Sequence, residues 1–282
     1  MLEISKNQEI NVFDKILNEA VHLPGVRIKR SEFLNKSLSK YFNKDVVDKA
    51  IELNPALAGI TKSELEKIVK SSINFEMKKL TALSAAAGVP GGLGLLVTVP
   101  GDFAQYFVHV IRIMQKLMYL YGWEEVFQDD DSIDDETLSI LTLFLGVMFG
   151  VKAANKVIFS LAVGAGERVK KELVEKALTK GTIYPIVKKI SLALNVKMTK
   201  KVFASGVAKM IPLLGAVTSG GLSFISFKSM TSKLKNHLEN LPITEPGFYS
   251  NDGKALADEI TIDVADIDEN DFDIHLNDTD NS

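Results

Sequence analysis

Three long stretches without a charged residue constrain this chain more than any other feature of its sequence. They cover Leu80–Gly101 (22 residues), Thr137–Val151 (15 residues) and Met210–Phe227 (18 residues). A helix that crosses a bilayer needs ~20 predominantly apolar residues. Glycines and prolines interrupt the first and third stretches, and the second is short. The pattern therefore favours buried core helices over membrane spans, with re-entrant or interfacial insertion as the alternative.

We predict a structural role for the glycines and prolines in these stretches. The run Gly91-Gly92-Leu93-Gly94 lacks the Lys-Ser/Thr pair that follows in a phosphate-binding loop, and no strand precedes it. In an apolar helical body, a small residue instead lets two helices approach closely. The predicted structural positions are Gly88, Pro90, Gly91, Gly92, Pro212, Gly215, Gly220 and Gly221.

Elsewhere the apolar residues recur at helical spacing, and no segment before residue 255 alternates like a strand. Thr61 and Glu64 form a capping box for a helix that runs to about Ala87. Asp102 stands at an N-cap position after Pro100-Gly101, and Leu138–Leu161 fits one apolar helix or two. We therefore predict an all-α fold, a compact multi-helix bundle with glycine- and proline-broken apolar helices, followed by an acidic C-terminal tail.

The net charge of -3 hides a basic body and an acidic tail. Residues 251–282 carry eleven acids and one lysine, a sum of -10, so residues 1–250 sum to +7. This composition favours disorder in the tail, with a hairpin or partner-docking strands as the alternative. We predict four regions: an N-terminal helix over 1–26, a helical domain over 27–241, a linker over 242–250 and the acidic tail over 251–282.

The positive charge of the body is concentrated in Glu167–Lys201, which has ten basic residues and three acids. Such a stretch beside apolar helices is typical of a site for a membrane surface or an acidic partner, with a merely solvated face as the alternative. Nucleic acid is disfavoured because no aromatic–basic interleaving or binding motif is present. The tail could fold back on this patch, and its removal should then raise affinity for anionic membranes. The predicted binding residues are Arg168, Lys170, Lys171, Lys188, Lys189, Lys197, Lys200 and Lys201.

Candidate catalytic residues are confined to one helix. Its polar seam, at three- and four-residue steps with Tyr106 beside it, consists of Asp102, Gln105, Tyr106, His109 and Arg112, and Lys116 continues the same face. His109 could act as a general base with Asp102 as its orienter, but seven residues separate them by ~10 Å along a helix. A catalytic pair would need a partner from elsewhere in the chain. The favoured interpretation is a polar seam that hydrogen-bonds the neighbouring glycine-rich backbone.

The sequence predicts no metal site and no cofactor. The chain has no cysteine, and its four histidines are scattered. The acidic loop Asp129–Glu136 lacks the glycine of an EF-hand loop. The N-terminus has no basic patch followed by an apolar run, so no signal peptide is expected.

The central part of the chain resembles the bacterial EcsC family. The resemblance covers roughly residues 27–236 and is most specific in Pro100–Phe107 and His109–Trp123, with a departure at Gly101, where a small residue such as Ala is expected. The other matching segments are Ala86–Leu93, Leu143–Val151, Tyr184–Lys189 and Lys209–Gly221. The family's namesake is encoded beside an ABC-type transporter in some bacteria, and no catalytic residue comes with the resemblance.

The expected function is that of a non-enzymatic, membrane-associating or adaptor protein of the EcsC type. Its partner would be a membrane surface or a membrane protein such as a transporter, and a protein partner for the acidic tail is a further possibility. The resemblance implies a bacterial protein, cytoplasmic or peripheral at the inner membrane. Two alternatives stay open: a hydrolase acting on a lipid or peptide through His109, and a membrane-inserting pore or toxin-like protein.

Overall fold

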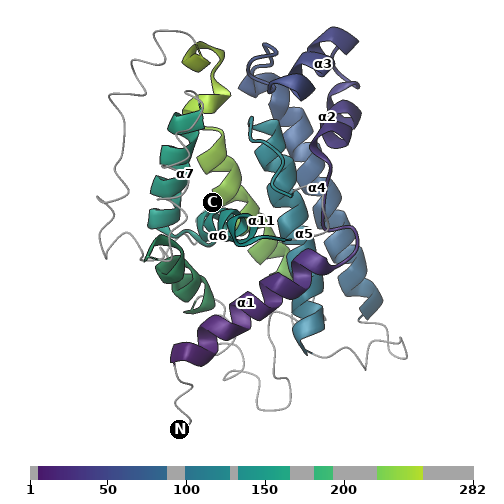
Figure 1. Cartoon of the computed structure of the whole chain (residues 1–282). Coiled ribbons are helices and arrows are strands. Elements are labelled where there is room, and N and C mark those ends of the chain that lie inside the picture. The colour runs from purple at the N-terminus through teal and green to yellow at the C-terminus, as the bar shows by residue number, and fades with distance from the viewer. Residues whose placement is uncertain (1–5, 88–98, 128–132, 166–180, 193–220, 250–282) are drawn as a thin grey trace, which may run out of the picture.

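The computed structural model describes residues 6–87, 99–127, 133–165, 181–192 and 221–249 (Figure 1). Within these ranges the chain is helical and contains no strand, which confirms the predicted all-α fold. The helices are α1 (Lys6–His22), α2 (Arg30–Leu38), α3 (Lys44–Glu52), α4 (Lys62–Ala87), α5 (Val99–Leu120), α6 (Asp135–Phe149), α7 (Lys152–Ala165) and α11 (Gly221–Leu238). Residues 181–192 are also helical, and two 3-10 turns follow α11, η2 (Pro242–Thr244) and η3 (Pro246–Tyr249).

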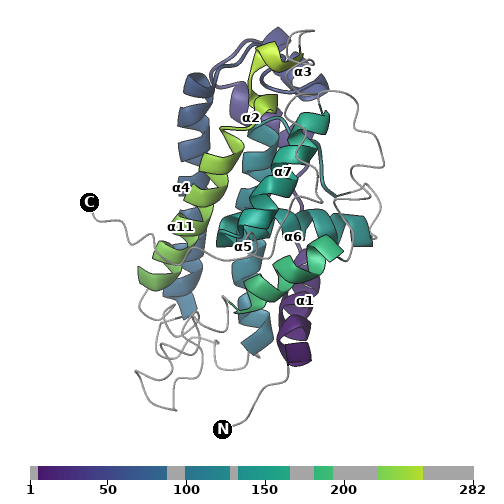
Figure 2. The same ribbon diagram turned by 90° about the vertical axis from the view of Figure 1, so that its left-hand side faces the viewer.

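Helix α5 lies at the centre of the bundle and contacts α1, α2, α4 and α11. Figure 1 shows α4 and α5 side by side, with α1 crossing α5 obliquely. In the view of Figure 2, α6 lies across the bundle, and it packs against α7 and α11. Ile111, Met114 and Leu117 of α5 are fully buried. Because almost every side of α5 faces another helix, the few polar residues it carries must find partners inside the protein.

Helix boundaries follow local signals that the sequence carries. At the start of α4, the Thr61 backbone N–H donates to the Glu64 carboxylate at 2.9 Å, and the Glu64 N–H donates to the Thr61 hydroxyl at 3.3 Å. This is the predicted capping box. Gly150, with a φ of 82°, ends α6 in a left-handed turn before α7 begins. The apolar stretch around it is therefore two helices rather than one.

One predicted boundary is wrong. Helix α5 begins at Val99, so Asp102 lies inside the helix and not at its N-cap. Pro100 is the second helical residue, where a missing backbone N–H costs nothing because the first N–H groups of a helix have no intrahelical partner. The proline therefore starts this helix instead of preceding it.

Gly146 shows why a small residue is needed where α6, α7 and the helix over 181–192 meet. A Cβ added at Gly146 would lie 2.7 Å from the Cβ of Ala154 and 2.8 Å from Cγ2 of Ile186. Real Cβ atoms do not approach other carbons this closely, so only glycine fits without movement of the neighbours. Gly146 is not one of the predicted structural positions, although close helix contact is the role that we predicted for them. Seven of the eight predicted glycine and proline positions lie outside the described residues, and Gly221 is the first residue of α11.

Both flanks of the predicted helical domain pack against it. Phe13 and Ala20 of α1 are fully buried, and α1 contacts α5. The segment 242–249, which the sequence suggested as part of a linker, buries Ile243 and Phe248 in the core. Lys62 Nζ also pairs with Glu245 at 2.6 Å. Residues 242–249 therefore contribute to the packed body, and the acidic tail over 251–282 lies outside the described residues.

Candidate functional site

The polar seam of α5 meets a carboxylate from α4. His109 Nδ1 lies 2.9 Å from Glu76 Oε2, and Arg112 Nε donates to Glu76 Oε1 at 3.2 Å. Lys116 Nζ donates to the same Oε1 atom at 2.5 Å. The three bases stand at three- and four-residue steps on α5, so a single carboxylate can face all of them. We call Glu76, His109, Arg112 and Lys116 the Glu76 cluster.

The cluster is buried but keeps its carboxylate charged. The side chain of Glu76 is fully buried, and those of His109 and Lys116 are 13% and 8% exposed. Burial raises the pKa of Glu76, but hydrogen bonds from His109 and Lys116 and the positive charges of Lys116 and Arg112 outweigh it and bring that pKa to about 2. Burial lowers the pKa of Lys116, and the Glu76 carboxylate opposes that shift. An ionised Glu76 therefore permits two permanent cations to sit between α4 and α5.

Further polar residues of α5, together with Arg112 of the seam, hold the connection between α1 and α2. Gln115 Nε2 donates to the Val26 carbonyl at 2.8 Å, and the Ile28 N–H donates to Gln115 Oε1 at 2.9 Å. The Tyr119 hydroxyl donates to the Ile28 carbonyl at 3.0 Å. Arg112 Nη1 donates to the Gly25 carbonyl. An extended segment buried against a helix needs partners for its backbone groups, and α5 supplies them. Among the described residues of the predicted seam, Arg112 bonds neighbouring backbone, whereas His109 and Lys116 bond the Glu76 side chain, so a seam that bonds glycine-rich backbone stays a prediction.

The remaining predicted seam residues do not join the cluster. Tyr106 is buried, its hydroxyl lies 3.6 Å from Sδ of Met230 in α11, and burial raises its pKa. Gln105 is exposed. Asp102 lies in the first turn of α5, and its side chain is outside the described part. The partner that His109 required from elsewhere is Glu76, a residue that we did not predict.

The sequence does contain a signal for Glu76. Leu65, Val69, Ser72 and Leu80 recur at three-, four- and eight-residue steps and are all buried in α4. Glu76 falls on that stripe, four residues from Ser72 and four from Leu80. A carboxylate on a buried stripe requires cationic or hydrogen-bonding partners, and the seam of α5 offers them. Only the packing of α4 on α5 shows that the two patterns meet.

The cluster has one feature of a catalytic pair and one that opposes catalysis. A carboxylate bonded to Nδ1 of a histidine can orient the imidazole as a general base. Such a carboxylate also stabilises the imidazolium that forms during the reaction. Here Glu76 also accepts hydrogen bonds from Arg112 and Lys116, so its negative charge is shared among three partners and is not dedicated to His109. The geometry therefore supports a structural role for His109 more than a catalytic one.

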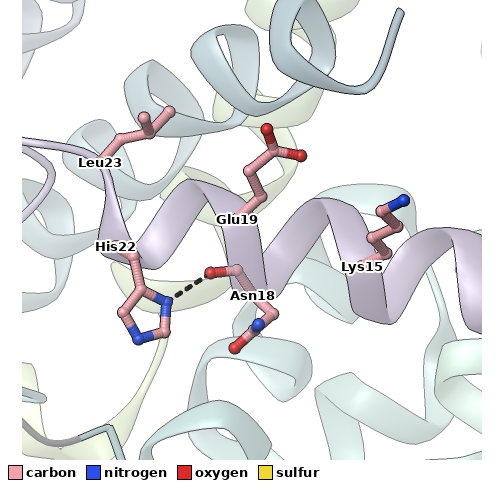
Figure 3. Close-up of a pocket in the computed structure, with 5 residues that line it drawn as sticks. All are labelled: Lys15, Asn18, Glu19, His22 and Leu23. Carbon is pink, nitrogen blue, oxygen red and sulfur yellow. Dashed lines mark hydrogen bonds between the residues drawn. The ribbon is translucent and has the colours of Figure 1, made fainter.

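A hollow on the surface of α1 is separate from this cluster. It has a volume of about 520 Å³ and is lined by Lys15, Asn18, Glu19, His22 and Leu23 (Figure 3). His22 Nδ1 donates to the Asn18 carbonyl at 2.6 Å, an ordinary contact between residues four apart on one helix. Because its lining comes from one helix and the residue after it, the hollow offers no set of converging polar groups of the kind found in ligand sites.

The outer side of α4 carries an exposed aromatic ring among lysines. Phe75 is 50% exposed, and its ring centroid lies 4.8 Å from Lys79 Nζ and 4.7 Å from Lys116 Nζ. Lys67 and Lys78 are also exposed on this helix. The one acid between residues 67 and 87 is Glu76, which is buried. We call Lys67, Phe75, Lys78 and Lys79 the α4 basic face.

The predicted basic stretch is described only in part. Lys188 and Lys189 lie on the helix over 181–192 and are partly exposed, and Tyr184 on the same helix is 51% exposed. The other predicted binding residues are outside the described part: Arg168, Lys170, Lys171, Lys197, Lys200 and Lys201. The α4 basic face is a second cationic surface that we did not predict.

No family model, curated protein or solved structure matched this chain. The resemblance to the EcsC family therefore stays a prediction that rests on its quoted residues. Among the residues that the structure describes, none of the helices combines the length and the apolar character that crossing a bilayer requires. Within the same ranges, no three His, Asp or Glu side chains are grouped so that they could hold a metal ion.

Proposed function

We propose that this protein works without catalysis, as an adaptor that attaches to an anionic membrane surface through the α4 basic face. The observation that carries the proposal is the half-exposed Phe75 ring between the ammonium groups of Lys79 and Lys116. Interfacial helices combine such an apolar side chain, which enters the headgroup region, with lysines that meet the lipid phosphates. A cytoplasmic position at the inner membrane, as the EcsC resemblance implies, belongs to the same proposal.

Charge and geometry support surface attachment. Helix α4 lies at the edge of the bundle in both views (Figures 1 and 2), and the four residues of its basic face are exposed. A lysine close to an anionic leaflet contributes about 1 kcal/mol, so a few lysines and one phenylalanine give weak, salt-sensitive binding. Lys116 also links this face to the Glu76 cluster, which holds its ammonium group in place. The face is therefore fixed on a rigid element of the fold.

A hydrolase is the second candidate, because the His109–Glu76 hydrogen bond of 2.9 Å resembles an oriented base. The two cations on the same carboxylate make this the weaker proposal, for the electrostatic reason given above. A catalytic His109 would show itself in a general screen with ester, amide and phosphoester substrates. Activity that disappears in His109→Gln while the variant keeps its fold would favour the hydrolase over the adaptor.

Flotation on liposomes tests membrane attachment. The full chain is mixed with vesicles of phosphatidylcholine alone or with phosphatidylglycerol, at low and at high salt. We expect flotation with the anionic vesicles at low salt and its loss at high salt, because lysine–phosphate attraction is screened. Phe75→Ala and Lys78→Glu/Lys79→Glu should each reduce the bound fraction severalfold.

Matched controls come from α2. Tyr41 is 54% exposed, and Lys36 and Lys40 are exposed lysines on or beside the same short helix. Tyr41→Ala and Lys36→Glu/Lys40→Glu remove the same kinds of group and should leave flotation unchanged. Equal losses of flotation in the α4 variants and the α2 controls would mean that net charge alone drives binding. That outcome would also overturn the role of the α4 basic face. If the wild type floats and the α4 variants float equally well, the proposed role of the α4 basic face is overturned.

A further inference from the structure

The acidic tail and the α4 basic face are complementary in charge. Residues 251–282 sum to -10, and the α4 basic face holds three exposed lysines, Lys67, Lys78 and Lys79. The tail also carries Phe272, Ile274 and Leu276 at alternate positions among its acids. The α4 basic face offers one exposed aromatic ring among its lysines. The tail and the α4 basic face thus each combine charged residues with apolar ones.

The structure also places the root of the tail close to α4. Lys62, the first residue of α4, pairs with Glu245 at 2.6 Å, and Asn54 Nδ2 donates to the Tyr249 hydroxyl at 3.0 Å. From Lys62 to Phe75 the helix rises by about 20 Å over 13 residues. The 14 residues from Tyr249 to Asp263 can span up to about 45 Å when extended. The acidic part of the tail is therefore long enough to lie along the α4 basic face.

From these observations we infer that the tail of this chain, residues 251–282, docks on the α4 basic face and competes there with anionic membranes. Tethering supports an intramolecular contact, because a short connection gives the tail an effective concentration near the millimolar range at its own face. Lysines engaged by tail carboxylates are not available to lipid phosphates. The docking does not depend on the proposed function, and only its consequence for membrane binding rests on that function.

This docking site differs from the basic stretch over 167–201 that the sequence suggested. The α4 basic face is preferred because its lysines and its exposed ring lie along the same helix that contacts the tail's root. A tail that instead binds the basic stretch would leave α4 untouched. The experiment below separates these two positions.

Paramagnetic labelling of the full chain tests the docking directly. The chain has no cysteine, so Asn74→Cys gives a single attachment point on the exposed side of α4. A nitroxide there should reduce the amide signals of residues 263–276 to less than half, at low salt and without any lipid. The same label at the exposed Asn18→Cys position of α1 should leave those signals unchanged.

The variants of the membrane experiment serve here as well. Lys78→Glu/Lys79→Glu should abolish the signal loss, whereas Lys36→Glu/Lys40→Glu should preserve it. Tail signals that are unaffected by the α4 label in the wild-type chain would overturn the inference. Signal loss that survives the α4 charge reversal would place the tail elsewhere and overturn it too.

The consequence for membranes is measured with a full chain whose tail charge is halved, from -10 to -5. Five tail acids are changed together, as Asp263→Asn, Asp266→Asn, Asp268→Asn, Asp271→Asn and Asp273→Asn. Flotation on anionic vesicles should rise severalfold over the wild type. If the label reports docking but neither protein floats, the inference stands and the proposed function fails. If both proteins float equally and no docking is detected, the proposed function stands and the inference fails.

Discussion

Glu76 occupies a position on the buried stripe of α4 where helical spacing favours an apolar side chain. It can be there because three bases of α5 face it within 3.2 Å. A buried charge with several partners is tolerated, whereas the removal of one partner leaves the others uncompensated. Stability at this position thus depends on a match between two helices that are 33 to 40 residues apart in the chain.

The first prediction concerns this residue. Glu76→Gln should lower the free energy of unfolding by about 3 kcal/mol at neutral pH, because the buried Lys116 and the partly buried Arg112 lose their counter-charge. Urea unfolding followed by circular dichroism measures the change. Glu66→Gln on the same helix is the control, since Glu66 makes an exposed pair with Lys70 at 3.0 Å and should cost less than about 1 kcal/mol. Equal effects of the two substitutions would contradict the role of burial.

At the scale of secondary-structure elements, Gly146 of α6 permits a close contact of three helices. Gly146 allows α6 to approach Ala154 of α7 and Ile186 of the helix over 181–192 more closely than any side chain would permit. Protein interiors are dense, so an added methyl group forces shifts in its neighbours. Helical periodicity by itself does not distinguish this glycine from one that merely ends a helix, such as Gly150.

Gly146→Ala tests this contact. We expect a loss of about 1–3 kcal/mol, because overpacking outweighs the better helix propensity of alanine. Thermal or chemical unfolding reports the loss. Gly247→Ala is the matched control, since a Cβ there meets nothing within 4 Å and should change stability by less than about 0.5 kcal/mol. A stabilised Gly146→Ala variant would show that the helices can separate without cost.

The stability of the whole molecule should fall with acid in two steps. Burial lowers the pKa of His237 to about 4, against a hydrogen bond with the backbone of Asn155 that raises it. The neutral imidazole is favoured in the folded state, so its contribution is complete above pH 6.5 and is lost as the pH falls towards about 4. The Glu76 carboxylate follows, with a contribution that is complete above pH 4.5 and lost as the pH falls towards about 2.

Urea titrations at several pH values between 7 and 2 test the two steps. One titrating group changes the free energy of unfolding by at most about 1.4 kcal/mol per pH unit. His237→Gln should remove the dependence between pH 6.5 and 4 and leave the lower step in place. His22→Gln, which replaces an exposed histidine of α1, should leave both steps unchanged. A single step below pH 4 in the wild type would contradict the role of His237.

Local signals were sufficient for most of the fold. The capping box at Thr61 and Glu64 and the helical stripes are interactions between residues a few positions apart, so the sequence predicts them directly. The start of α5 was misplaced because Asp102 has the side chain of an N-cap residue, whereas Pro100 is equally suited to the first turn. The sequence alone does not show which of these two residues sets the start of α5.

The sequence predicted the α5 side of the candidate site but not the α4 side. The three- and four-residue spacing of His109, Arg112 and Lys116 places them on one face of α5, and this follows from helix geometry alone. Their shared partner Glu76 and the exposure of Phe75 depend on how α4 packs, which is a contact between distant parts of the chain. The sequence by itself determined an all-α body, a polar seam and an excess of charge, because these depend on spacing and composition. Only the tertiary structure decided that the seam is paired internally and that the outer side of α4 is left open, because burial is a property of packed helices and not of one segment.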